Sequence, residues 1–233
     1  DVVATLNYNE IEGFPISTVQ GHKGRFIFGY VNGVPVVCMQ GRVHFYEGYP
    51  MTDVVLPTRL MKMLGAKVLF LTNAAGGLNY EFSAGDFMMI TDHINLSFTN
   101  PLIGPNDDSF GPRFPDMSNA YDKDLQLLAS NIAKEENINI EKGVYLMVSG
   151  PNFETSAEVR TFGLLGADAV GMSTVPEVIS ASYCGIKTIG FSVITNMGTG
   201  LQTATQSHDE TLAMANKATS NLATLLNKLF ERI

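Results

Sequence analysis

The sequence predicts a single α/β domain with a mixed, largely parallel central sheet flanked by helices. Residues 68–71 are continuously apolar, as in a strand buried on both faces, and do not alternate as in a half-solvated strand. From residue 34 onward the predicted strands and helices alternate, which is typical of α/β architectures. No internal repeat or linker divides the 233 residues, so one domain over 1–233 is expected.

The N-terminal part is expected to contain antiparallel strands. Residues 25–31 and 34–39 are rich in β-forming side chains, and Asn32 and Gly33 join them. Both residues tolerate the positive φ of a tight turn, so the pattern predicts a β-hairpin. The second strand then runs into a segment dense in hydrogen-bonding side chains, residues 40–50, where functional groups are expected.

A helix and a buried strand follow the hairpin. Thr52 or Asp53 can cap the helix, and Gly65 can end it. The strand that begins at residue 68 is predicted to stop in the small residues 73–77, which would let a ligand approach the backbone N–H groups. A tight turn without any ligand explains these small residues as well, and both interpretations stay open.

Capping boxes and apolar runs mark the remaining elements. The boxes begin at Thr155, Thr174 and Ser207, and the last starts a long C-terminal helix. The irregular segment 93–120 is uncommon in a compact domain unless it lines a site or an interface. The other predicted elements are strands at 87–92, 144–148, 168–171 and 187–195 and helices at 122–136, 155–165 and 174–184.

Composition excludes several classes of partner. With 15 Lys and Arg against 23 Asp and Glu, the net charge is −8, which argues against a broad nucleic-acid interface. A small anion can still be held where a few cations and backbone donors converge. No run approaches the roughly eighteen apolar residues of a membrane helix, and no signal-peptide pattern opens the chain. We therefore expect neither nucleic acid nor membrane as a partner.

The common signatures of cofactor and metal enzymes are missing from the sequence. It contains no GxGxxG after a strand and no GxxxxGK[ST], GxSxG or HExxH, and no pair of its four histidines has an obvious metal spacing. Cys38 and Cys184 form no CxxC pair, so they are expected to be buried, reduced thiols. Reduced thiols suit a cytoplasmic protein.

Polar or small clusters follow each predicted strand, which places them together on one rim of the sheet. Arg42, His44, Ser173 and the backbone of Ala74 suit an anion, because Arg offers a fork of donors and the hydroxyl and amide complete a cradle. Arg42 and His44 can equally be solvated loop residues. Only the convergence of several strand ends favours an anion site.

A second group of residues on this rim suits a planar heterocycle. The Phe153 ring can stack on such a ring, while Glu154 and Asn196 can pair with its N–H and C=O groups. Glu154 can instead be a negative charge that stabilises a helix N-terminus, and Met172 can be a core residue.

At these residues the chain resembles the trimeric, low-molecular-mass purine nucleoside phosphorylases, from residue 21 to the C-terminus. The resemblance implies the nucleoside phosphorylase fold and a homotrimer with shared sites. The segments 196–198 and 207–210 look closer to bacterial members than to animal ones. The motifs that carry the resemblance are GHKG (21–24), MQGRVHFYEGY (39–49), TNAAGG (72–77), GPNFET (150–155), GMSTVPE (171–177) and TN (195–196).

The resemblance also implies roles for individual residues. The phosphate-binding set is Arg42, His44, Ser173 and the Ala74 amide, with His22 nearby. The base would rest on Ala75 and Gly76 beside Phe153, with Glu154 holding N1–H and Asn196 facing O6 and N7. Ribose would contact Tyr46 and Met172, His208 would reach the 5′-hydroxyl, and Phe98 would close the sugar pocket of a neighbouring subunit.

One feature of the family is not found in the sequence. The family carries a Gly-Ser-Gly-Leu-Gly phosphate loop upstream of its hairpin, and residue 1 falls shortly after the place of that loop. Either an N-terminal segment is missing from the sequence, or this protein lacks one serine ligand to phosphate. We favour the first explanation, because loss of the strand that accompanies the loop would expose a sheet edge.

The implied reaction is phosphorolysis of 6-oxopurine nucleosides, inosine and guanosine or their deoxy forms, to free base and (deoxy)ribose 1-phosphate in purine salvage. Asn196, Glu154 and His44 would carry catalysis, inorganic phosphate would be the co-substrate, and no metal or organic cofactor is needed. One alternative is methylthioadenosine phosphorylase, for which we expect Asp in place of Asn196 and no His208. The other is a catalytically silent nucleoside-binding protein.

Overall fold

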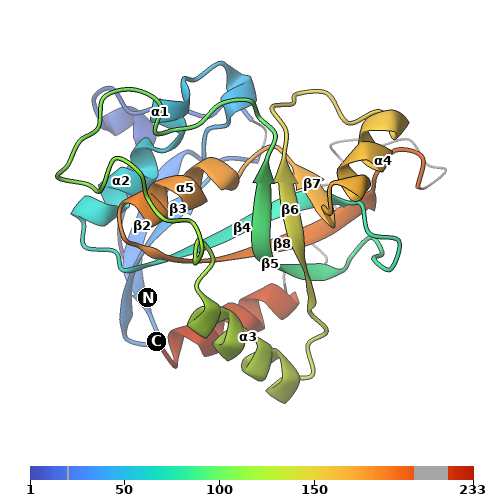
Figure 1. Ribbon diagram of the computed structural model, residues 1–233. Helices are drawn as coiled ribbons and strands as arrows, with labels where there is room; N and C mark the ends of the chain where they lie inside the picture. The colour runs from blue at the N-terminus through green and yellow to red at the C-terminus, as the bar shows by residue number, and fades with distance from the viewer. Residues whose placement is uncertain (20, 202–219) are drawn as a thin grey trace.

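The computed structural model describes residues 1–19, 21–201 and 220–233. Its centre is a closed five-stranded barrel with the strand order β4-β7-β6-β5-β8 (Figure 1). Three neighbouring pairs, β4–β8, β5–β6 and β6–β7, are parallel, whereas β4–β7 and β5–β8 are antiparallel. The barrel strands are β4 (Val68–Gly77), β5 (Phe87–Asn95), β6 (Glu141–Met147), β7 (Ala169–Gly171) and β8 (Lys187–Met197).

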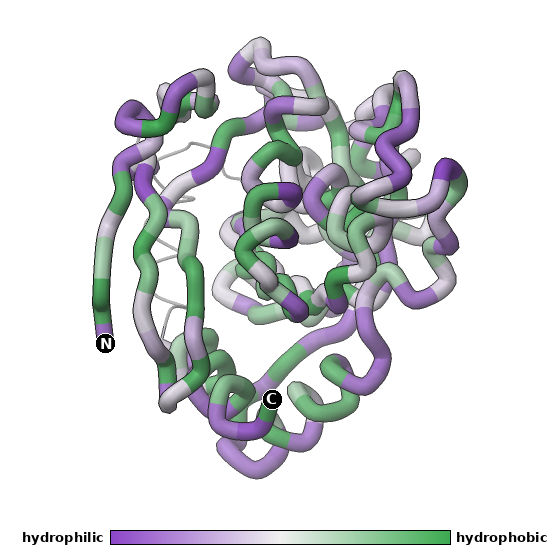
Figure 2. The backbone as a smooth tube through the Cα atoms, turned by 90° about the vertical axis from the view of Figure 1, so that its left-hand side faces the viewer, coloured by the Kyte–Doolittle hydropathy of each residue, from purple (hydrophilic) through white to green (hydrophobic). Residues whose placement is uncertain are grey.

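The predicted fold class is confirmed: the sheet is mixed, largely parallel and flanked by helices. The closure of that sheet into a barrel was not predicted, because apolar runs identify strands but do not identify their neighbours. In Figure 2 hydrophilic residues gather along the outer loops and turns of the chain. No described helix is long and apolar enough to span a membrane.

Strand β4 is longer than the sequence pattern indicated. The prediction that the strand ends before residues 73–77 was wrong, since all five of these residues pair with β8. At Gly77 the absent side chain leaves room for that of Met197: a Cβ added there would meet Sδ of Met197 at 2.7 Å. Within this strand Ala74 is exposed and Ala75 is buried, so one side of the paired strand is accessible.

A separate three-stranded antiparallel sheet precedes the barrel, in the order β1 (Val2–Asn7), β2 (Arg25–Val31) and β3 (Val34–Gln40). The predicted hairpin is confirmed, with φ of 51° at Asn32 and 82° at Gly33. The expectation that Cys38 is buried was wrong. This residue lies on β3, an outer strand of the small sheet, and is exposed, whereas Cys184 is buried.

The first predicted helix is divided into two, α1 (Met51–Val54) and α2 (Leu56–Met63). Pro57 lacks the N–H that would continue the hydrogen-bond ladder, and the backbone turns at Val55. Neither Thr52 nor Asp53 is the N-cap, because α1 begins one residue after Pro50. Gly65 follows the end of α2 with a φ of 91°, as expected of a glycine that ends a helix.

Helix α3 (Lys123–Glu135) confirms the helix predicted over 122–136, and α4 (Ser156–Leu164) begins at its predicted capping box. The Asp122 carboxylate accepts from the Leu125 amide at 3.0 Å. Thr155 and Glu158 form the expected capping box of α4. Helix α5 (Val175–Tyr183) begins differently and is described with the site below. The predicted capping box at Ser207 lies outside the described residues.

In one hydrophobic cluster the barrel packs against α3 and against the helical residues 220–230. These two helical segments lie side by side beneath the barrel in Figure 1. Burial of each large apolar side chain there stabilises the fold by roughly 1.5–3 kcal/mol. This packing lies away from the end of β3 and from the α5 turn, where the polar residues gather. Members of the cluster are Phe87, Leu125, Ile132, Phe191, Leu225 and Leu229.

Candidate active site

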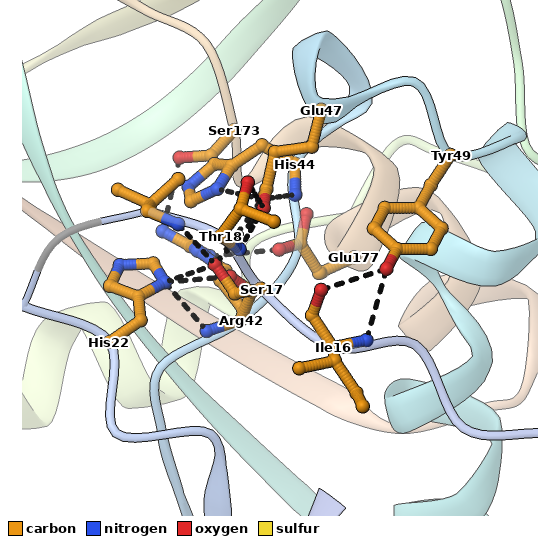
Figure 3. Close-up of polar contacts among 11 residues, drawn as sticks. Ile16, Ser17, Thr18, His22, Arg42, His44, Glu47, Tyr49, Ser173 and Glu177 are labelled. Atoms are coloured by element: carbon orange, nitrogen blue, oxygen red, sulfur yellow. Dashed lines mark hydrogen bonds and ion pairs between the residues drawn. The ribbon is translucent and has the colours of Figure 1, made fainter. Parts of the chain in front are cut away.

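Arg42 is the centre of a polar cluster just after β3. Its Nη1 donates to Oε1 of Glu177 at 2.8 Å, and its Nη2 donates to Oγ of Ser173 at 3.0 Å (Figure 3). Nη2 also donates to the carbonyl oxygen of Thr72 in β4 at 3.0 Å. The segment after β3, strand β4 and the turn before α5 therefore meet at one guanidinium group.

Two predicted histidines lie beside Arg42. Nδ1 of His22 is 2.7 Å from the Arg42 carbonyl oxygen, and the rings of His22 and His44 have centroids 5.2 Å apart. The His44 ring stacks on Tyr46, with 4.8 Å between centroids and 13° between planes. The structure thus brings together the predicted anion ligands and the residue predicted to contact ribose.

His44 is held in its neutral form. Burial and the nearby positive charge of Arg42 lower its pKa from 6.5 to about 4. Its Nδ1 lies 3.1 Å from Oε1 of Glu47, and the same carboxylate oxygen accepts from the His44 backbone N–H at 2.7 Å. A carboxylate can only accept, so Nδ1 carries the proton, and Nε2 is left as an acceptor for a ligand hydroxyl.

Glu47 is a charged partner for this histidine. Burial alone would raise the pKa of Glu47, but hydrogen bonds from the Thr18 amide and from His44 outweigh burial and lower it. The Thr18 amide donates at 2.6 Å and the Thr18 hydroxyl at 3.0 Å. The residues just before His22 therefore help to fix the His44 ring (Figure 3).

Ser173 and Thr174 form the turn between β7 and α5. Thr174 has a φ of 75°, which is unusual for a β-branched residue. Nδ2 of Asn73 donates to Oγ1 of Thr174 at 2.9 Å. The predicted capping box at Thr174 and Glu177 was wrong, because Thr174 binds Asn73 and Glu177 binds Arg42.

Glu154 is a buried carboxylate in the segment after β6, and burial raises its pKa. The neighbouring Phe153 ring is 41% exposed, as expected of a surface on which another ring can stack. The Thr155 amide donates to Glu158 at 2.7 Å, so Glu158 supplies the cap of α4. Glu154 is therefore not needed as the capping residue of that helix.

Asn196 lies near the end of β8, directly across from Gly76 in β4. Its Oδ1 accepts from the Thr195 hydroxyl at 3.0 Å, and its Nδ2 donates to the Met197 carbonyl oxygen at 3.3 Å. The register of the two strands shifts between Ala75 and Gly76, so Thr195 is an additional residue on β8. This bulge brings the Asn196 amide to the glycine.

The segments after β6 and β7 touch through Met172. A Cβ added to Gly150 would meet Sδ of Met172, and the φ of 67° at Gly150 also favours glycine at this position. The segment that leads to Glu154 therefore packs against the segment that carries Ser173. The predicted base-binding and phosphate-binding residues lie on strand ends that are in direct contact.

Two predicted residues are not brought into this cluster by the described contacts. Phe98 is 91% exposed with a φ of 57°, and His208 lies outside the described residues. Phe114 is a second exposed aromatic residue in the same irregular segment, at 87%. It lines a cleft of about 510 Å³ together with His93 and Arg113. Exposure alone does not distinguish Phe98 from Phe114 as a residue that contacts another subunit.

Comparison with known proteins decides the family. The family model described as "Phosphorylase superfamily" matches residues 1–231. The chain belongs to the phosphorylase superfamily. The chain is 54% identical over 224 residues to purine nucleoside phosphorylase 1 of Bacillus subtilis (strain 168), which covers 96% of this chain and 83% of the relative. It is 49% identical over 212 residues to purine nucleoside phosphorylase 1 of Geobacillus stearothermophilus, covering 91% of this chain and 77% of the relative.

Solved structures of the superfamily share the fold. The purine nucleoside phosphorylase of Schistosoma mansoni, solved in complex with inosine, superimposes with a TM-score of 0.94 at 43% identity, covering 99% of this chain and 84% of that one. A Schistosoma purine nucleoside phosphorylase in complex with hypoxanthine superimposes with a TM-score of 0.93 at 42% identity, with the same coverage of both chains. The resemblance to purine nucleoside phosphorylases, including bacterial members, is confirmed.

Two charged residues of this phosphorylase were missed by sequence reasoning. Glu47 follows His44 by three residues inside a recognised motif, so a search for carboxylates close to the predicted histidine could have found it. Glu177 is 135 residues from Arg42 in the chain, and its place in a capping pattern gave it another interpretation. Only the assembled fold pairs it with Arg42.

Proposed function

We propose that this protein is a purine nucleoside phosphorylase that cleaves inosine and guanosine, with inorganic phosphate, to the free purine and ribose 1-phosphate. One observation carries the proposal: the polar cluster around Arg42 lies on strand ends that touch those leading to the buried Glu154. The Bacillus and Schistosoma relatives that bear this name support it.

The cluster around Arg42 is suited to phosphate. The guanidinium supplies charge and donors, and the Ser173 hydroxyl lies within 3.0 Å of it. Neutral His44 offers Nε2 as an acceptor for a phosphate hydroxyl. We assign Arg42, His44, Ser173 and the exposed Ala74 to this subsite, with His22 behind them. These groups act mainly by orienting the attacking oxygen toward C1′.

The reaction forms a bond from a phosphate oxygen to C1′ and breaks the bond from C1′ to the purine nitrogen. The bond to the base stretches first, so the sugar acquires oxocarbenium character, and attack proceeds with inversion. The electron pair leaves with the purine, which takes up a proton from water. Donors preplaced for such developing charge are typically worth about 3–4 kcal/mol each.

Substrate choice depends on Glu154 and Asn196. An ionised Glu154 accepts from N1–H, which 6-oxopurines carry and adenosine lacks, and the Asn196 amide donates to O6 or N7. A buried acceptor left unpaired would disfavour adenosine by orders of magnitude. We place the base over Ala75 and Gly76, against Phe153.

The sugar site and the assembly are further parts of this proposal. Ribose would lie against Tyr46 and Met172, and His208 would reach the 5′-hydroxyl. We propose a homotrimer in which Phe98 of one subunit closes the sugar pocket of the next, and a role in cytoplasmic purine salvage. Sedimentation of the purified protein tests the trimer directly.

The deciding experiment measures release of hypoxanthine from inosine with and without inorganic phosphate, with adenosine in parallel. Turnover that requires phosphate and spares adenosine is the expected result. Turnover without phosphate would indicate a hydrolase, and efficient adenosine cleavage would contradict the base assignment. Asn196 disfavours methylthioadenosine phosphorylase, for which Asp is expected there. Inosine binding without turnover would identify a silent nucleoside-binding protein.

A further inference from the structure

We propose that Glu177 is a positioning residue of the phosphate site, which holds the Arg42 guanidinium in one orientation for the phosphate co-substrate. The inference rests on the proposed phosphorolysis and extends it by one residue. Glu177 is buried, with 7% of its surface exposed, and it belongs to the first turn of α5. We do not place it in contact with the substrate.

The described hydrogen bonds fix Arg42 on three sides. Glu177 holds Nη1 at 2.8 Å, while Ser173 and Thr72 hold Nη2, each at 3.0 Å. A guanidinium has five N–H donors, so these bonds leave two for a ligand. Ser173 and Thr72 are neutral acceptors. Glu177 is thus the charged member of this set of partners, and charge-assisted hydrogen bonds are roughly twice as strong as neutral ones.

Among the residues that the structure describes, the side-chain hydrogen bond of Glu177 is the one that it accepts from Arg42. Its second oxygen, Oε2, is buried and has no hydrogen-bond partner in the described part of the chain. Thr174 makes no side-chain capping bond at the start of α5, so Glu177 does not complete a capping box. Burying a carboxylate is costly unless it is paired, and the observed pairing is with the proposed phosphate ligand.

Two explanations of the pair make opposite predictions for phosphate affinity. If Glu177 positions Arg42, its loss frees a long side chain, which phosphate binding must then immobilise at an entropic cost. Affinity for phosphate then falls. If Glu177 acts only as a nearby negative charge, its removal leaves Arg42 more attractive to an anion. Affinity for phosphate then rises.

Substitution by Gln separates positioning from charge. Glu177→Gln keeps an oxygen that can accept from Nη1, so we expect the Kd for inorganic phosphate to stay within about threefold of the wild type. Glu177→Ala removes the acceptor, and we expect this Kd and the KM for phosphate to rise about tenfold or more. The KM for inosine should change less than about twofold in both variants, because no nucleoside contact is lost.

The matched control is Ser180→Ala, which alters a buried polar residue of the same helix. Ser180 is fully buried, and it is not part of the proposed site. Calorimetric titration with inorganic phosphate and steady-state kinetics with inosine are measured on all proteins. The variant Arg42→Ala and the double variant Arg42→Ala with Glu177→Ala complete a double-mutant cycle. In the absence of Arg42, the removal of Glu177 should not change the affinity for phosphate.

The outcomes separate this inference from the proposed function. Wild-type protein that binds phosphate but does not cleave inosine would overturn phosphorolysis, and the calorimetric comparison would still test Glu177. Unchanged or tighter phosphate binding by Glu177→Ala would overturn positioning, as would tighter binding by Glu177→Gln. If Glu177→Ala does not fold, Glu177→Gln and the double variant, which leaves no unpaired buried charge, still give the decisive comparison.

Discussion

The side-chain amide of Asn196 lies against the backbone of Gly76. The two residues are paired across β8 and β4, and a Cβ at position 76 would lie 3.4 Å from Nδ2 of Asn196. The Thr195 hydroxyl donates to Oδ1 of Asn196, which fixes the orientation of the amide. The amide nitrogen therefore lies in van der Waals reach of a residue without a side chain, close to the backbone of β4.

Replacing Asn196 by Asp should change which purine is accepted. A carboxylate cannot donate to O6 but can accept from a 6-amino group, so kcat/KM for inosine should fall about 100-fold and adenosine cleavage should rise. Asn131→Asp on the exposed face of α3 adds the same charge and serves as the control. Parallel assays with both nucleosides test the prediction, which an unchanged preference for inosine would contradict.

The activity on inosine should depend on the ionisation of Glu154. Burial raises the pKa of this carboxyl above that of an ordinary glutamate, and the ionised form is the stronger acceptor for N1–H, because protonation removes the charge and turns one oxygen into a donor. We therefore expect kcat/KM to fall as the pH drops through that raised pKa. Glu154→Gln should lower kcat/KM for inosine by about 100-fold, and kcat/KM of this variant should no longer fall in that acidic pH range. If kcat/KM of both proteins falls in the same way at low pH, another group causes the fall.

The stability of the protein should depend on pH through His44. Its pKa is about 4 in the folded chain and about 6.5 when unfolded, so the unfolded chain binds more protons between these values. Unfolding free energy therefore falls as the pH drops through this window. Urea denaturation measures this fall. Between the two pKa values the wild type should lose up to about 3 kcal/mol more unfolding free energy than His44→Asn, because each pKa unit is worth about 1.4 kcal/mol. Parallel curves for the two proteins would contradict the assignment.

Phe98 and Phe114 make a paired test of the shared sugar pocket. If Phe98 closes a neighbouring site, Phe98→Ala should raise the KM for inosine about tenfold, while the Kd for inorganic phosphate stays near that of the wild type. Phe114→Ala is the matched comparison, because that ring is equally exposed in the same segment. A larger effect of Phe114→Ala would transfer the role to that residue.

Local signals in the sequence predicted the local structure well. The Asn32–Gly33 turn and the Thr155–Glu158 capping box each depend on residues within four positions of one another, and both are confirmed. The convergence of strand ends also placed Arg42 near Ser173. The motifs of the family supplied the remaining residues of the candidate site.

The errors came from partners that are distant in the chain. Thr174 and Glu177 match a capping box by spacing, but Asn73 and Arg42 compete for their side chains and bind them instead. Residues 73–77 resemble a turn in composition, yet hydrogen bonding to β8 keeps them in a strand. Propensity is a weak prior that tertiary contacts override at such positions.

If Asn196 binds the base as we propose, the bulge at Thr195 makes the register of β8 a determinant of substrate recognition. In a regular parallel ladder Thr195 would stand across from Gly76, and the extra residue places Asn196 there instead. A change that removed the bulge but kept the order Thr195–Asn196 would therefore put a hydroxyl, in place of the amide, across from Gly76. Under the proposed base assignment, homologues that keep these motifs but lack the bulge should differ in the purine that they accept.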